Sequence, residues 1–231
     1  MNDIAWDKLK LVIFDVDGTL YDQKKLRRKV LAGLLGYYLL RPWKLRDLYI
    51  LYHFRKQREN KAGLYFNDLE NAQYGWCAEK TKSSVLEVKK VVQQWIFDYP
   101  VKFLSDCIYP GVSEFLNTIK TCHVSKAVYL DYPTREKNLA MNLNFELEVS
   151  STDSYINAMK PSAKGLEYIM DVLKIHDSAS CLFIGDRYEL DGKCAAAANV
   201  PFLLINRNEA SLGFYYKLAE QLKHSRISDE L

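Results

Sequence analysis

The sequence has little that would hold it within a membrane. The apolar run over residues 30–40 is far too short to span a bilayer. Trp6, Asp7 and Lys8 interrupt any apolar leader before the first apolar segment begins. These absences exclude a membrane-spanning protein and predict a soluble or peripheral one, for which we expect a cytoplasmic location.

The chain is equally poor in metal-thiolate and disulfide patterns. Its five cysteines include no Cys-x-x-Cys pair, and its four histidines are scattered without the spacing of a zinc site. Cys181 falls in an apolar segment typical of a buried strand and Cys194 in an Ala-rich helical segment, so we expect core thiols rather than disulfides. With 48% hydrophobic and 26% charged residues, the 231-residue chain is typical of a folded protein with one well-buried core plus an insertion.

Near its start the sequence has an apolar segment, residues 11–14, that ends in two acids. Asp15 and Asp17 follow it directly, and Gly18 comes next. A segment apolar at every position is typical of a strand buried on both faces, and ligands bind at the carboxyl ends of such parallel strands. Two carboxylates brought together repel each other unless a cation lies between them or one holds a proton, and Mg2+ prefers such oxygen ligands. A polar Asp-Gly turn would explain Asp17 and Gly18, but it leaves Asp15 unexplained.

Beyond residue 105 the sequence alternates between helix and strand patterns. This alternation predicts an α/β fold, a doubly wound parallel sheet with right-handed crossovers and helices on both faces. The acids that follow the strands would then share one rim of the sheet. The expected elements are a helix over 110–120, a strand over 126–130, a helix over 134–143, a strand over 146–150, a helix capped by Ser162 and running to 173, a strand over 181–185, a helix over 191–198, a strand over 201–205 and a last helix from about 212.

The stretch between residues 22 and 105 has helix patterns and no strand pattern. Ser84 and Glu87 resemble a capping box that opens a helix running towards Asp98. The expected apolar face of this helix consists of Val88, Val91, Val92 and Trp95. An inserted helical unit is therefore expected here.

Residues 22–62 form a basic segment, with twelve Lys/Arg against three Asp/Glu, although the whole chain has a net charge of only +3. Leu45, Leu48, Tyr49 and Tyr52 recur at helical spacing and indicate an amphipathic helix. The favoured interpretation is that this apolar stripe packs on a neighbouring helix while the basic side chains face water. The alternatives are attraction of an anionic substrate, contact with an anionic membrane surface, and, ranked last for want of any motif, binding of nucleic acid.

Three segments together resemble the motifs of the haloacid dehalogenase-like (HAD) hydrolases, most of which are phosphatases. The stretch from Asp15 to Thr19 is similar to the first motif, and Lys160, which precedes a proline, is similar to the third. The strand that ends in Asp186, with Asp191 five residues later, is similar to the fourth, although Asp191 could also merely cap the Ala-rich helix after it. The resemblance covers residues 8–22 and 105–206.

The resemblance implies a Rossmann-like core domain over residues 1–21 and 106–231 and a helical cap domain over 22–105. An insertion between the first and second motifs matches the cap of the family's first subclass. The gap of about 25 residues between the second and third motifs leaves no room for the other kind of cap. Caps of this kind admit small molecules and exclude water, so a small phosphorylated metabolite is expected rather than a phosphoprotein.

Roles for individual residues also follow from the resemblance. Asp15 is expected to attack phosphorus and form an aspartyl-phosphate, and Asp17 to protonate the leaving oxygen and then activate water. Lys160 would neutralise Asp15 and the phosphoryl oxygens, and Thr19 would support Asp17 and its loop. The metal set expected for Mg2+ is Asp15, the backbone carbonyl of Asp17, Asp186 and Asp191, and the expected phosphate-binding set is Thr19, Asp131 and Lys160.

The second motif departs from the family pattern. Leu130 occupies the place where a Ser or Thr hydroxyl should meet the phosphoryl group, and losing such a donor costs about a hundredfold to a thousandfold in rate. Thr134, four residues later, is a candidate replacement. We favour a Mg2+-dependent phosphohydrolase, with a weakly active or inactive relative that binds a phosphate ligand, a partner or a membrane as the alternative. A phosphomutase ranks lower, and the acid at Asp17 argues against a dehalogenase.

Overall fold

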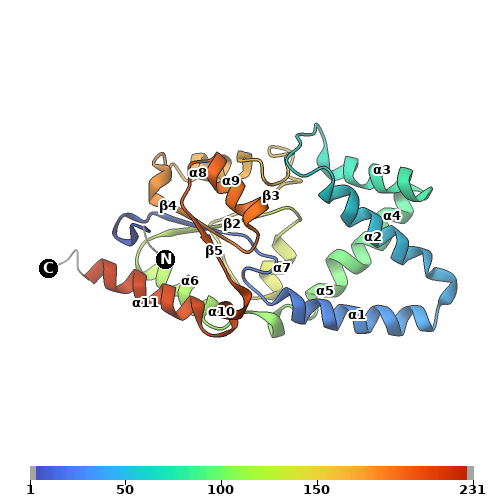
Figure 1. Ribbon diagram of the computed structural model, residues 1–231, viewed down its shortest axis with the longest axis horizontal. Helices are drawn as coiled ribbons and strands as arrows, with labels where there is room; N and C mark the ends of the chain where they lie inside the picture. The colour runs from blue at the N-terminus through green and yellow to red at the C-terminus, as the bar shows by residue number, and fades with distance from the viewer. Residues whose placement is uncertain (1–3, 228–231) are drawn as a thin grey trace.

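The computed structural model describes residues 4–227 and contains one five-stranded, fully parallel sheet. Its order is β3-β2-β1-β4-β5, so the first strand of the chain lies at the centre (Figure 1). The strands are β1 (Leu11–Phe14), β2 (Ser125–Leu130), β3 (Leu147–Ser150), β4 (Cys181–Gly185) and β5 (Phe202–Leu204). This order is that of a doubly wound α/β sheet, and it confirms the fold class predicted from the alternation of strands and helices.

Helices cover both faces of the sheet, because the side chains of each strand alternate between the two. Val12 and Phe14 of β1 belong to a core shared with the inner faces of α6 (Val112–Thr121) and α11 (Phe214–Ile227). Leu11 and Ile13 face the other side, with α8 (Lys164–Val172) and α9 (Lys193–Ala197) (Figure 1). The smaller helices of this part are α7 (Arg135–Ala140) and α10 (Arg207–Ser211).

The cysteines take the place expected of core thiols. All five are free, and four of them, Cys77, Cys107, Cys181 and Cys194, are buried. Burial raises the pKa of the Cys181 thiol to about 11, so this thiol stays protonated at neutral pH. The prediction of buried thiols instead of disulfides is confirmed.

A second group of helices lies to one side of the sheet (Figure 1). We call these the cap helices: α1 (Gln23–Leu39), α2 (Arg46–Glu59), α3 (Leu69–Thr81), α4 (Val85–Val92) and, after a π-helical turn over Gln93–Asp98, α5 (Tyr99–Val101). The Ser84 hydroxyl accepts the backbone N–H of Glu87, as expected of a capping box. The predicted apolar face of this helix is buried throughout: Val88, Val91, Val92 and Trp95.

The prediction for the apolar face of α2 was wrong. Leu45, at the N-cap, and Leu48, Tyr49 and Tyr52 within the helix are all exposed. The face that packs against α3 and α4 instead carries Ile50, Leu51 and Phe54, which share a core with Tyr74, Cys77 and Val88. Both stripes have helical spacing, so the register of burial depends on the neighbouring helices, which the spacing does not reveal. In the described part of the chain, no helix has both the length and the apolar character needed to cross a membrane.

Candidate active site

The first two acids stand directly beyond the central strand. The Asp15 N–H donates to the carbonyl of Ile184 on β4 at 2.8 Å, which continues the sheet pairing one residue past β1. Gly18 then turns the chain with φ +91°, a conformation that glycine adopts without strain. A Cβ at this position would lie 2.3 Å from Oδ2 of Asp186, so any other residue at position 18 would displace the Asp186 carboxylate from its place in the site.

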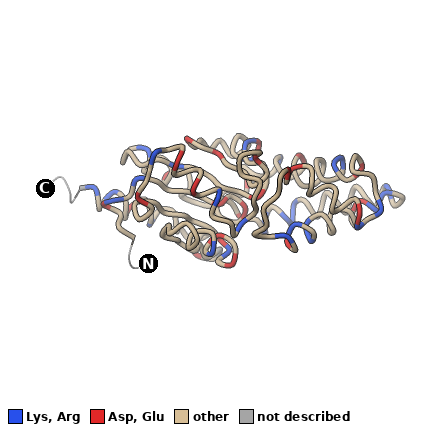
Figure 2. The backbone as a smooth tube through the Cα atoms, turned by 90° about the horizontal axis from the view of Figure 1, so that it is seen from above, with Lys and Arg blue, Asp and Glu red and all other residues tan. Residues whose placement is uncertain are grey.

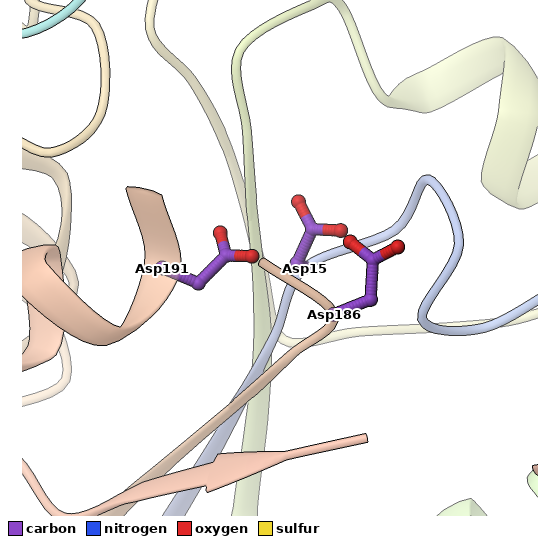
Figure 3. A group of neighbouring side chains, drawn as sticks. All are labelled: Asp15, Asp186 and Asp191. Carbon is purple, nitrogen blue, oxygen red and sulfur yellow. The ribbon is translucent and has the colours of Figure 1, made fainter. Parts of the chain in front are cut away.

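Three acids converge at this rim of the sheet (Figure 3). Asp15 follows β1, Asp186 follows β4, and Asp191 comes from the π-helical turn over Tyr188–Gly192. Each offers a carboxylate oxygen, and these oxygens lie within 4.8 Å of one another. The suggestion that Asp191 caps the next helix is not supported, because its carboxylate accepts the Arg187 N–H and binds a lysine instead.

That lysine is Lys160, which the sequence assigned to the third motif. Its Nζ lies 2.7 Å from Oδ1 of Asp15 and 2.8 Å from Oδ1 of Asp191, and its side chain is buried. Burial would lower the pKa of Lys160, but the acids around it outweigh burial and hold the pKa well above the usual value. Lys160 is therefore a fixed positive charge between two of the acids.

Asp131 supports the loop that carries Lys160. One of its carboxylate oxygens accepts the backbone N–H of Lys160 at 3.1 Å and the Ser151 hydroxyl at 2.6 Å. Its backbone carbonyl accepts a bond from the buried guanidinium of Arg58. The structure places Asp131 in the wall of the site, with its acceptors engaged in holding neighbouring segments.

The acids at this place repel one another. Burial raises the pKa of Asp15 well above its usual value; Lys160 opposes the rise, and Asp191 and Asp186 add to it. Lys160 contacts two of the three acids, Asp15 and Asp191. A group of three carboxylates is an all-oxygen ligand set, which suits a divalent cation such as Mg2+.

Asp17 lies apart from this acidic group. Its carboxylate accepts two bonds from Nζ of Lys137, at 2.6 and 2.8 Å, and one from the Tyr21 hydroxyl at 2.6 Å. Burial would raise the pKa of Asp17, but Lys137 and Tyr21 outweigh it, so the pKa lies below the usual value. Lys137 was not identified from the sequence. It lies on α7, the helix that follows β2, and the carboxyl end of β2 opens on the site. This position in the chain was the signal that could have identified it.

Two hydroxyl groups differ from expectation. Thr19 was expected to support Asp17, but its hydroxyl donates to Oδ2 of Asp15 at 3.1 Å, since the turn at Gly18 carries it back over β1. Thr134, the candidate replacement for the missing hydroxyl, donates to Glu148 at 3.2 Å and does not line the cavity at the site. Leu130 does line this cavity, as expected of the position at which the family's second motif has a Ser or Thr.

The acids open into a cavity of about 610 Å3 between the sheet and the cap helices. Arg27, Arg55 and Arg58, all from the basic segment over residues 22–62, contribute positive charge to its wall. Arg58 is buried, and its guanidinium lies 4.3 Å from the centre of the Tyr132 ring. The apolar part of the wall consists of Leu26, Val30, Ala62, Ile96, Phe97, Pro100, Val101, Leu104, Leu130, Met159 and Leu190.

A family model described as haloacid dehalogenase-like hydrolase matches residues 9–199. Because this match covers most of the chain, including every acid described above, the protein belongs to the haloacid dehalogenase-like hydrolases. No curated protein sequence matches the chain.

Solved structures share the fold at low sequence identity. A HAD phosphatase from Thermococcus onnurineus is 17% identical, with a TM-score of 0.58 and 87% of each chain covered. A 2-haloacid dehalogenase from Pseudomonas syringae is also 17% identical, with a TM-score of 0.56 and 86% of each chain covered. A protein assigned as a β-phosphoglucomutase from Thermotoga maritima is 19% identical, with a TM-score of 0.53, and the match covers 94% of this chain and 99% of that one. Structures named for three activities therefore share this fold, and the choice among these activities depends on the site.

Proposed function

We propose that the protein is a Mg2+-dependent phosphohydrolase that acts on a small phosphorylated metabolite through an aspartyl-phosphate intermediate. The observation that carries this proposal is the arrangement of Asp15, Asp17 and Lys160 around one cavity, with Asp186 and Asp191 beside them. The acid at position 17 favours phosphoryl transfer over dehalogenation, because proton transfer to and from oxygen needs such a group.

In the proposed reaction, Asp15 attacks phosphorus in line while the bond to the leaving oxygen breaks. Lys160 and the Thr19 hydroxyl hold the two oxygens of this nucleophile through the contacts of 2.7 and 3.1 Å. Asp17, once its carboxylate has taken up a proton from solvent, delivers that proton to the leaving oxygen and later takes one from the water that hydrolyses the intermediate. Freezing Asp15 in one orientation reduces the entropy lost on reaching the transition state.

Mg2+ would be held by Asp15, Asp186 and Asp191, with the backbone carbonyl of Asp17 as a further ligand. When bound, the ion screens the crowded acids from a phosphate and stabilises the charge that develops on its oxygens. The three carboxylate oxygens within 4.8 Å of one another support this assignment.

Lys137 takes over the role of the hydroxyl that is missing at Leu130. Both residues line the same cavity, and the ammonium of Lys137 can bind a phosphoryl oxygen as a point charge. The ammonium lies beside Asp17, the expected proton donor, so it also lies close to where the leaving oxygen would bind. A charged donor at this place gives the phosphoryl group the stabilisation that a neutral side chain at position 130 cannot give.

We further propose that residues 22–105 form a cap domain over a core of residues 1–21 and 106–231. The cavity supports this division, because α1 and α2 supply one side of its wall and the strand ends supply the other. Arg27 and Arg55 on the cap side favour an anionic substrate of a size that fits about 610 Å3.

The test is a steady-state assay of aryl phosphate hydrolysis with Mg2+ and with a chelator in its place. The proposal expects phosphate release that requires Mg2+ and disappears in Asp15→Asn, followed by selection of the substrate from a panel of phosphorylated metabolites. A weakly active relative is the second candidate, favoured by Leu130 and by the ion pair that occupies Asp17. Release of phosphate no faster than in Asp15→Asn, across the whole panel, would select this second candidate.

A further inference from the structure

The turn between α1 and α2 exposes its large apolar side chains. Leu39, Leu40 and Trp43 are 83%, 73% and 75% exposed. This turn lies at the end of the cap helices farthest from the sheet (Figure 1). We call residues 39–46 the cap tip.

Apolar exposure continues from the cap tip along both adjoining helices. On α1, Leu31 and Leu35 precede Leu39 at intervals of four residues and are also exposed, so the three follow one side of the helix. On α2 the exposed stripe consists of Leu45, Leu48, Tyr49 and Tyr52. So many exposed large apolar side chains within residues 31–52 are uncommon on a surface that faces only water.

Folding of the cap helices does not require these side chains. The core between these helices is built from other residues, among them Tyr38, Ile50, Phe54 and Trp95, all buried. The exposed stripe therefore lies opposite the packed face of α2, and the interpretation in which Leu45, Leu48, Tyr49 and Tyr52 pack on a neighbour does not hold.

Basic side chains alternate with the apolar ones at the cap tip. Arg41 and Lys44 are exposed and form no ion pair with any residue that the structure describes, whereas the Arg46 guanidinium donates to the backbone carbonyls of Thr81 and Lys82 at 3.2 and 2.7 Å. The Arg41 guanidinium lies 4.5 Å from the centre of the Tyr37 ring, and Lys44 donates to the Tyr37 hydroxyl at 3.1 Å. Figure 2 shows Lys and Arg at this end of the molecule. The positive charges of Arg41 and Lys44 are therefore available to an external partner.

Two features of the cap tip together indicate the kind of surface that it fits. Leu and Trp side chains partition into the boundary between headgroups and acyl chains, and Lys or Arg among them pair with anionic headgroups. A second copy of the same surface is a poor partner, because the cap tip carries Arg41, Lys44 and Arg46 with no Asp or Glu and would repel itself.

We infer that the cap tip docks on an anionic membrane surface. Leu39, Leu40 and Trp43 enter the interface, while Arg41 and Lys44 bind lipid phosphate groups. The protein then contacts the bilayer by one end of the cap helices, and the sheet with its acids stays in the aqueous phase. This inference does not depend on the catalytic assignment.

Cosedimentation of the full chain with vesicles tests the inference. Vesicles of equal parts phosphatidylcholine and phosphatidylglycerol are expected to bind the protein at low salt, with loss of binding as salt rises. Vesicles of phosphatidylcholine alone are expected to bind it at least about tenfold more weakly, because they lack anionic headgroups.

Matched variants locate the contact. Leu40→Ser with Trp43→Ser, and separately Arg41→Ser with Lys44→Ser, are expected to weaken binding by about tenfold or more. The control for the apolar variant is Leu212→Ser, at a leucine that is 82% exposed. The control for the basic variant is Lys120→Ser with Lys174→Ser. All three residues lie on the surface outside the cap helices, so both controls are expected to bind like the unaltered chain. All these side chains are exposed, so the fold should persist, which circular dichroism checks.

Three results would overturn the inference. The first is no binding to the anionic vesicles at low salt. The second is cap-tip variants that bind as well as the controls. The third is an oligomer, seen by light scattering without lipid, that Leu40→Ser with Trp43→Ser dissociates, because the surface would then serve self-association.

Discussion

Lys137 and Asp17 stand 120 residues apart in the chain, and their side chains meet at 2.6 and 2.8 Å in the wall of the cavity. Lys137 thereby fixes the position of Asp17, the acid that is expected to exchange protons with the leaving group. Together with Tyr21 it keeps the pKa of Asp17 below the usual value in spite of burial, so Asp17 is a carboxylate at neutral pH. The cation that makes this pair lines the same cavity as Leu130, the position at which the family pattern expects a hydroxyl.

The effect of replacing Lys137 should depend on the residue at position 130. Lys137→Met is expected to lower kcat by about tenfold or more, because a hydrogen bond to a charged group is worth about 1.5–3 kcal/mol. Leu130→Ser should raise kcat by up to about tenfold, less any cost of the void it leaves. In the double variant the loss from Lys137→Met should shrink, since the new hydroxyl takes over part of the contact. The kinetics of the unaltered chain, the two single variants and the double variant form a double-mutant cycle. Strictly additive effects would refute the proposal that Lys137 replaces the missing hydroxyl.

Thr134→Ala is the matched control for this cycle. The Thr134 hydroxyl donates to Glu148 outside the cavity, so kcat and KM should not change. A loss of kcat comparable to that of Lys137→Met would instead assign the missing hydroxyl to Thr134.

Asp15→Asn should abolish Mg2+-dependent turnover and leave the fold intact. The amide has nearly the same shape, but it cannot act as a carboxylate nucleophile. The substitution also removes the carboxylate that Asp186 and Asp191 repel, so the metal-free variant should melt at a temperature equal to or above that of the unaltered chain. Phosphate release and thermal melting measure both effects. Asp171→Asn, at an exposed acid far from the site, is the control and should be fully active; full activity of Asp15→Asn itself would refute the nucleophile.

Mg2+ should stabilise the protein, and Asp186→Asn should reduce this stabilisation. A ligand that binds only the folded state adds about 2.7 kcal/mol at a concentration one hundred times its Kd. Thermal melting in Mg2+ and in chelator is expected to show an increase in Tm with Mg2+ for the unaltered chain and a much smaller one for Asp186→Asn. In chelator the variant should be the more stable of the two, because it relieves crowding with Asp15. An equal increase in Tm with Mg2+ for both proteins would show that Asp186 is not a metal ligand.

Arg27 and Arg55 should guide an anionic substrate, whereas their neighbour Arg28 should not. Arg27 and Arg55 line the cavity, and Arg28 does not. Arg27→Gln with Arg55→Gln is therefore expected to lower kcat/KM by about tenfold and to weaken its dependence on salt, with kcat little changed. Arg28→Gln is the matched control of the same chemistry on the same helix. If all three substitutions leave kcat/KM and its salt dependence unaltered, these arginines are ordinary solvated side chains.

Local patterns were enough for the core of the site. The strand before Asp15 is apolar at every position, which only a doubly covered strand in a parallel sheet requires, and the same holds for the strand before Asp186. Acids that follow such strands must meet at one rim, whatever the details of packing. For this reason the sequence sufficed to predict the parallel sheet and the rim shared by Asp15 and Asp186, whereas Lys160 and Asp191 were assigned from the resemblance to the family motifs.

The spacing within α2 was not enough to predict which side of the helix is buried. Tyr49 and Ile50 are adjacent, and each belongs to a stripe with good helical spacing, yet Ile50 is buried and Tyr49 is half exposed. The choice depends on Tyr74 and Val88, which lie on other helices and meet α2 only in the folded chain.

The sequence by itself determined the order of strands and helices, the rim at which the acids gather and the absence of a hydroxyl at position 130, because these follow from residues close together in the chain. Only the tertiary structure decided that Lys137 pairs with Asp17, that Thr19 supports Asp15, and that the cap tip faces outward. Contacts between segments far apart depend on how whole helices pack, and packing is a sum of many weak contacts that no short motif records.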